Sequence, residues 1–503
     1  MANERQGCRN CRRRRIICDK TLPKCFKCGT RSLECPGYGP NYRWKSTAYD
    51  QTRVKTEVEA LDLIQELSGQ ASMHQLSSSL VQTMTSDRGA EYTPQPKVMP
   101  APLFNASHLS SLPGYINNSL FSRLLHHYVM VITPELDWVD TAENVHRSII
   151  PSMGFKIPSI CFALLALSAG DLSTRMKLND LDSHNYTNIQ QRLQEDALTL
   201  LSTHLQALTA SFEPKGPLNK SQLREMLVSV FLLVCLGVRL GRNQIWELHL
   251  RAARALIDSW NAADGIVSHA GYGVERCIIQ LLGEFQTWLS IMTFGQSPRI
   301  TLKRGPGDWH APFDGYVHAL DQITILARRR LRQVPIDTAM EVDRLLKELE
   351  DTKKTTLEYS LQIPFNAANA RSAFSSLVEM FHQATLIYLF RAGLDHETAT
   401  RACTAPKLRL FQVLRGLPDI ETIAHNMPWP LFIAGTECHG CVESQKFVEA
   451  KMHEMIRLTG TLDRHRMLKF LHEVWTSEEM CEGVNWISIA QRWDWQGNAF
   501  LVQ

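Results

Sequence analysis

The chain has 503 residues, of which 44% are hydrophobic and 21% charged. This balance is typical of a globular protein with a sizeable core, and it excludes wholesale disorder and a disulfide miniprotein. The net charge is only +3, but residues 1–45 hold 12 Lys/Arg and 3 Asp/Glu, which leaves −6 for the rest. Six of the 13 cysteines fall between residues 8 and 35. We therefore expect a small, basic, cysteine-rich head and a large, mildly acidic body.

The start of the chain is polar and lacks the apolar segment of a secretory signal. Without such a signal, dense cysteines indicate metal ligands rather than disulfides. The most apolar run, Met226–Val238, has 13 residues. It is shorter than the roughly 18–20 residues that span a bilayer, so we expect a core helix and no membrane partner.

The head contains two copies of the spacing C-x2-C-x6-C, joined by six residues. Two tetrahedral zinc ions need eight metal–sulfur bonds, so six cysteines suffice only if two of them bridge both ions. Cys8 and Cys25, the first of each copy, are the natural bridging pair. Zinc binding of about 10 kcal/mol or more would supply the folding free energy that so short a segment lacks. The predicted metal ligands are Cys8, Cys11, Cys18, Cys25, Cys28 and Cys35.

Basic residues fill the spaces between these cysteines. Arginine can donate two hydrogen bonds to guanine in the major groove, and a basic surface binds phosphates by releasing counterions. Single-stranded nucleic acid would require several stacking aromatics, and only Phe26 lies inside the cluster. We therefore expect duplex DNA as the partner, contacted by Arg12, Arg13, Arg14, Arg15, Lys20 and Lys24.

The segment Gly7–Gly39 resembles the fungal binuclear zinc cluster, Zn2Cys6, of the galactose-regulator class. All six cysteines match, as do the basic run, Asp19 and Pro23. The resemblance implies two Zn²⁺ per chain and a first short helix that reads a CGG-type triplet, with base contacts at Arg14 and Arg15. It also implies that Cys8, Cys11, Cys18 and Cys25 hold one ion and Cys25, Cys28, Cys35 and Cys8 the other.

Residues 46–110 are expected to form a linker behind the head, which takes residues 1–45. Within it, residues 54–67 have helical periodicity over about two heptads, which fits a lone amphipathic helix better than a short coiled coil. In residues 68–103, Ser, Thr, Gln and Pro occupy 17 of 36 positions. Such a composition buries too little apolar surface to offset the entropy of ordering, so we expect disorder there.

Residues 111–503 show helical periodicity and few strand patterns, which predicts one large all-α domain, with room for two sub-bundles. Residues 124–140, 158–173 and 428–438 resemble the fungal-specific transcription factor domain. That resemblance implies a regulatory body, which in some members senses small molecules. The expected helices are 119–132, 157–169, 188–211, 221–238, 245–260, 274–293, 317–333, 337–360, 366–392, 408–416, 443–458 and 464–474.

Three features of the body invite other interpretations. Arg328–Arg332 could be an import signal, but a solvated helix face is the preferred interpretation. Cys438 and Cys441 imitate a redox or metal pair, yet no further ligands stand nearby, so we expect ordinary helical-domain cysteines. The chain contains no G-x-S-x-G, P-loop, G-x-G-x-x-G or H-E-x-x-H motif, so no catalytic residues are predicted.

These observations predict a nuclear, zinc-dependent, sequence-specific DNA-binding transcription factor that is not an enzyme. It would regulate RNA polymerase II genes through CGG-type triplets, as a pathway or specialised-metabolite gene-cluster regulator. A homodimer, and a small-molecule effector or coregulator, remain open as partners. The alternative is a small-molecule enzyme in the helical body, with the zinc head as a DNA tether.

Overall fold

The chain divides into two units, Met1–Lys55 and Thr56–Gln503, and each is described by itself. In the first unit, the described residues of the computed structural model include the short helix α2 (Phe26–Gly29). The predicted linker, with its helix at 54–67, lies outside the described residues. The structure describes residues 11, 16, 18–19, 25–31, 112–141, 144–176, 181–209, 220–241, 243–264, 274–295, 312–335, 337–363, 365, 370–417, 420–480 and 483–502.

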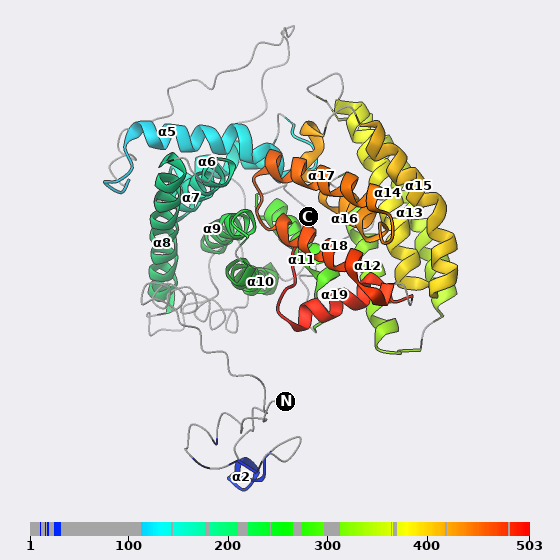
Figure 1. Cartoon of the computed structure of the whole chain (residues 1–503). Coiled ribbons are helices and arrows are strands. Elements are labelled where there is room, and N and C mark those ends of the chain that lie inside the picture. Colours follow the sequence, from blue (N-terminus) through cyan, green and yellow to red (C-terminus); the bar gives the residue numbers. More distant parts are fainter. Residues whose placement is uncertain are drawn as a thin grey trace. The chain divides into compact units, whose positions relative to one another are not determined.

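The second unit is all-α, as predicted: its described residues form helices and no strand (Figure 1). In chain order the elements are α5 (Asn118–His127), the π-helix η2 (Tyr128–Ile132), the 3-10 helix η3 (Thr133–Leu136), α6 (Val145–Gly154), α7 (Pro158–Arg175), α8 (Leu181–Thr209), α9 (Lys220–Arg239), α10 (Asn243–Asp264), α11 (Val274–Met292), α12 (Asp314–Leu331), α13 (Thr338–Ser360), α14 (Ala370–Gly393), α15 (His396–Gly416), η4 (Glu421–Asn426), α16 (Pro428–Thr436), α17 (Val442–Thr459), α18 (Arg464–Thr476), η5 (Glu478–Met480) and α19 (Trp486–Trp495).

Polar residues set the ends of these helices. The Asp337 carboxylate accepts a hydrogen bond from Met340 N at 3.0 Å and so caps α13. Asp395 caps α15 in the same way. At the other end of α17, Gly460 adopts a φ of +64°, a left-handed conformation that favours glycine. Its N–H closes the last turn by donating to Ile456 O at 2.8 Å.

The helices form two groups around one continuous hydrophobic core (Figure 1). In the first group, α7 packs against α6, α8 and α9, and α9 packs against α10. In the second, α14 packs against α12, α13, α15 and α16. Helix α11 contacts both α9 and α12, so it joins the two groups.

Helix α9 is the core helix that the apolar run predicted. The stretch Ser221–Arg239 has the length and composition of a membrane span, but 78% of its most apolar window is buried inside this unit. Gly237 permits a close approach to α10, because a Cβ there would stand 2.6 Å from the Trp246 Cβ. The apolar side chains of α9 therefore pack against other helices of the body.

Several helices differ from the sequence-based expectation. Helix α6 and the first half of α15 were not predicted, and each contains a proline, Pro151 and Pro406, that argues against a helix interior. Helix α16 was missed because all nine of its residues are buried, so it has no amphipathic period. Helix α19 was also missed. Tertiary packing overrides local propensity in these segments.

A network of ion pairs links elements far apart in the sequence. Arg175 and Arg239 each donate to Glu135, both at 2.7 Å, and both also pair with the fully buried Asp171. Although burial acts to raise it, Arg239, together with His127 and Arg175, holds the pKa of Asp171 well below its usual range. The network ties η3, α7 and α9 into one interior.

Candidate metal centre and nucleic-acid interface

Four predicted metal ligands lie together in the first unit. Cys11, Cys18, Cys25 and Cys28 are at most 9% exposed, and they form a small cluster of their own. Ile16 is the partly buried hydrophobic residue that packs against them. The sulfur atoms of Cys11 and Cys25 are 3.7 Å apart. The described part of this unit therefore has a core of thiols rather than of apolar side chains.

The ligand atoms fall into two groups that share a cysteine. One group is Cys11, Cys25 and Cys28, and the other is Cys18, Asp19 and Cys25; within each, the ligand atoms lie within 4.8 Å of one another. Cys25 belongs to both, which is the position expected of a bridging thiolate. Buried, clustered thiols are the donors that tetrahedral zinc prefers, so these residues fit a zinc cluster.

Short backbone turns bring these thiols together. The N–H of Cys28 donates to Cys25 O at 3.1 Å, which folds the C-x2-C pair into the turn that begins α2. The N–H of Ile16 donates to Cys11 O at 3.0 Å in the first half. Asp19 accepts from the Lys27 N–H at 3.2 Å and so connects the two halves. These backbone bonds bring the sulfurs of Cys11, Cys18, Cys25 and Cys28 to a common interior.

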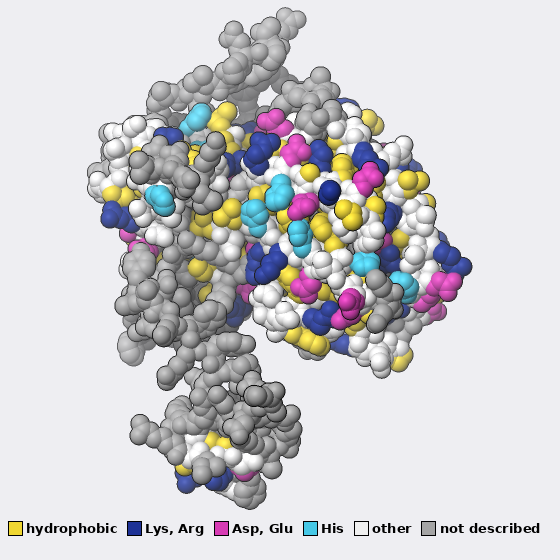
Figure 2. All heavy atoms as spheres, viewed as in Figure 1, with side chains coloured by type: hydrophobic (Ala, Val, Ile, Leu, Met, Phe, Trp, Pro, Cys, Tyr) yellow, Lys and Arg dark blue, Asp and Glu magenta, His cyan; other side chains and the backbone are white. Residues whose placement is uncertain are grey.

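The predicted site residues of the first unit fall partly outside the described residues. Cys8 and Cys35, the other two expected ligands, lie outside the described residues. Lys27 and Arg31, which are described, are exposed at the surface of this unit. Figure 2 shows basic side chains on the visible face of its described part. The predicted DNA contacts Arg12, Arg13, Arg14, Arg15, Lys20 and Lys24 also lie outside the described residues.

The arginine run of the body differs from its preferred interpretation. Arg328 donates to Ser290 O and Thr293 O, and Arg330 donates to Ala392 O at 2.7 Å, so these arginines bind carbonyls near the ends of α11 and α14. The expected solvated helix face is therefore wrong for Arg328 and Arg330.

The two cysteines near the start of α17 have different surroundings. Cys438 is fully buried, and burial raises its pKa to about 12, whereas Cys441 is exposed at the start of α17 and is not a core residue.

Comparison with known families defines the class of protein. Residues 6–45 match the fungal Zn(2)-Cys(6) binuclear cluster domain, and residues 123–499 match the fungal specific transcription factor domain. The chain belongs to this family of zinc-cluster transcription factors. Its cluster domain binds DNA and holds two Zn²⁺ ions, which agrees with the gathered thiols.

A curated relative is the acriflavine sensitivity control protein acr-2 of Neurospora crassa. It is 26% identical to this chain over 321 residues, which cover 51% of this chain and 52% of the relative. The chain thus spans about half the length of the curated relative it matches. No solved structure matches the chain.

Sequence reasoning missed one group of residues in the body. Asp137, Trp138, His425, Asn426 and Arg464 meet at an interior cavity, although they come from segments nearly 300 residues apart along the chain. His425 Nε2 lies 3.1 Å from Asp137 O, and the Asn426 amide donates to Trp138 O at 3.0 Å. No motif of fixed spacing marks these residues, so the sequence alone carried no signal for them.

Proposed function

We propose that this chain is a nuclear regulator of RNA polymerase II genes that recognises CGG-type triplets in duplex DNA through its zinc module. The observation that carries the proposal is the complete six-cysteine spacing around four consecutive arginines, Arg12–Arg15, in a segment whose described thiols are gathered and buried. In this proposal Arg14 and Arg15 read bases, while Lys20 and Lys24 extend the positive surface. The zinc ligands are Cys8, Cys11, Cys18, Cys25, Cys28 and Cys35.

Charge assigns DNA binding to the head rather than the body. Residues 1–45 carry a net +9, and the rest of the chain carries −6. DNA phosphates attract the first and repel the second, with a strong dependence on salt. We infer a division into a DNA-binding domain (1–45), a linker (46–110) and a regulatory body (111–503). The proposed targets are the genes of one metabolic pathway or specialised-metabolite cluster.

Base contacts and phosphate contacts can be separated with two variants of the full chain. Arg15→Ala should lower the preference for CGG-containing duplexes by about 1–3 kcal/mol, because it removes a base contact. Arg31 is exposed just after α2. Arg31→Ala should weaken binding to all duplexes equally and reduce the slope of log affinity against log salt concentration by about one. If Arg15→Ala also weakens all sequences equally, Arg15 contacts phosphate only and the proposed role in base recognition is wrong.

The enzyme alternative requires a different result. Both families found in the chain are those of transcription factors, which favours a protein that is not an enzyme. Deletion of residues 1–45 should abolish transcription of a reporter driven by bound sites. Catalytic turnover of a small molecule that survives the same deletion would support the enzyme instead.

A further inference from the structure

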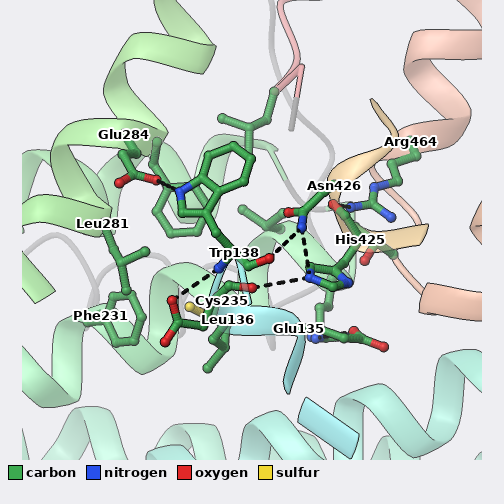
Figure 3. Close-up of a pocket in the computed structure, with 16 residues that line it drawn as sticks. Glu135, Leu136, Trp138, Phe231, Cys235, Leu281, Glu284, His425, Asn426 and Arg464 are labelled. Carbon is green, nitrogen blue, oxygen red and sulfur yellow. Dashed lines mark hydrogen bonds and ion pairs between the residues drawn. The ribbon is translucent and has the colours of Figure 1, made fainter. Parts of the chain in front are cut away.

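A partly open cavity of about 70 Å³ lies in the body where η3 and α9 of the first helix group meet α11, η4 and α18. It is lined by residues of η3, α9, α11, η4 and α18, and by Leu501 near the end of the chain. Figure 3 shows the Trp138 indole in the middle, between Glu284 and the pair His425 and Asn426. A molecule in this cavity would contact both α9 and α18.

One carboxylate at this cavity has no counter-charge. The side chain of Asp137 accepts a hydrogen bond from Trp138 N at 3.0 Å, and the charged group that acts on it is Asp140, a second acid. Among the described residues, no basic side chain pairs with Asp137. Burial raises the pKa of Asp137 to about 6, so it is largely ionised at neutral pH. Such a carboxylate calls for a cation or a strong hydrogen-bond donor.

The other charged groups at the cavity have partners within the protein. Glu135 is paired with both Arg175 and Arg239 at 2.7 Å. Arg464 donates to Thr459 Oγ1 at 2.7 Å and to the carbonyl of His425 at 3.1 Å. Asp137 differs from Glu135 at this cavity in having no basic partner among the described residues.

The walls beside Asp137 suit an organic cation. Phe231, Phe285 and Trp138 line the cavity, and aromatic faces attract cations. Glu284, which is buried, adds a second carboxylate and accepts a hydrogen bond from Trp138 Nε1 at 3.2 Å. A water needs roughly 10–15 Å³ of such space, so a cavity of this size suits a ligand of about five non-hydrogen atoms.

We propose that this cavity binds a small organic cation with N–H donors, of the amidinium or primary ammonium class. The N–H groups donate to Asp137, and the aromatic side chains surround the rest of the cation. The inference goes beyond the proposed function, because the cavity lies wholly within the body and DNA binding is assigned to the zinc module.

The test is saturation-transfer NMR on the purified full chain with three probes of similar size: methylguanidinium, neutral methylurea and anionic acetate. Methylguanidinium should bind, while methylurea and acetate should bind at least ten-fold more weakly. Asp137→Asn, which keeps the side chain's shape, should weaken methylguanidinium at least ten-fold. Asp343→Asn is the matched control, since Asp343 is exposed on α13, and it should change nothing.

Glu284→Gln provides a second variant if Asp137→Asn proves unstable by its melting curve, and it should also weaken methylguanidinium. The proposal is overturned if methylurea or acetate binds as well as methylguanidinium, if no cation binds, or if the variants bind it like the control. The affinity of Asp137→Asn for CGG duplexes should equal that of the unmodified chain. Failure of the cation site therefore leaves the DNA-binding proposal standing.

Discussion

The two units of the chain use buried cysteines in opposite ways. In the zinc module, the described core consists of thiols with one partly buried isoleucine. In the body, Cys403 and Cys438 are equally buried but sit within a large apolar cluster as small hydrophobic side chains. Burial alone therefore does not reveal the role of a cysteine. The surroundings decide it, because thiols that meet other thiols form a metal site and thiols among leucines form part of a core.

The comparison predicts that metal and apolar surface stabilise different units. Cys25→Ser removes the thiol common to both ligand groups, so the module should lose on the order of 10 kcal/mol of zinc-dependent folding free energy. Bound zinc should fall below two ions per chain, and DNA binding should be lost. The matched variant Cys403→Ser should destabilise the body by only about 1–3 kcal/mol. The Cys403 Sγ lies 3.9 Å from Ile387 O, which is too far for a hydrogen bond from a serine hydroxyl, so the buried hydroxyl would lose its bond to water without gaining a partner there. Zinc analysis and thermal melting measure both effects, and normal zinc content in Cys25→Ser would refute the shared ligand.

The body should instead be sensitive to its buried ion-pair network. Asp171→Ala leaves Arg175 and Arg239 with Glu135 as their acidic partner, and should destabilise the body by about 3–5 kcal/mol. Glu348→Ala removes an ion pair with Arg344 at the surface, and should cost about 0.2–1 kcal/mol. Urea unfolding measures the difference. Zinc content should stay at two ions in both variants, and a loss of zinc in Asp171→Ala would show that the units are not independent.

The smallest predicted effect depends on pH. The pKa of Asp137 is about 6 in the folded chain, above the ordinary 3.8, so the folded state binds more protons than the unfolded state between these pH values. Ionised Asp137 therefore costs stability, and the cost grows as the pH rises from 4 to 6. Asp137→Asn should stabilise the body by up to about 3 kcal/mol at pH 7 and hardly at all at pH 4.

Comparing the variant with the unmodified chain at each pH isolates this contribution. Asp463, whose pKa burial also raises to about 6, and the buried histidines titrate in both proteins and cancel in the difference. A stability difference that is constant from pH 4 to 7 would contradict the assignment of a half-buried carboxylate without a basic partner at Asp137.

The sequence predicted those features that depend on local spacing. The C-x2-C spacing predicted Cys25 and Cys28 as metal ligands, and these two thiols lie in one group. The helical period located α9 and α13 to within a few residues. Where local signals conflict with packing, prediction failed. Pro406 lies inside α15, and α16 is apolar on every side, so neither a breaker rule nor a period could describe them.

Features built from distant residues could not be predicted at all. In the ion-pair network, Arg239 pairs with Asp171 and also donates to Thr459 O at the end of α17. At the cavity, Asp137 lies beside His425. Each residue is ordinary in its own segment, and only the packing of helices gives it a partner. Arg328 is a similar case, since its place near a helix end, rather than its neighbours in the run, determines that it binds carbonyls.

The central claim is that zinc in the N-terminal module confers sequence-specific DNA binding. It is tested most directly by selecting duplexes from a random library with the full chain, once loaded with zinc and once after zinc removal by a chelator. The zinc-loaded protein should enrich CGG-type triplets, and the zinc-free protein should enrich no sequence. Enrichment of the same sequences without zinc, or no enrichment by a protein that holds two zinc ions, would contradict the account.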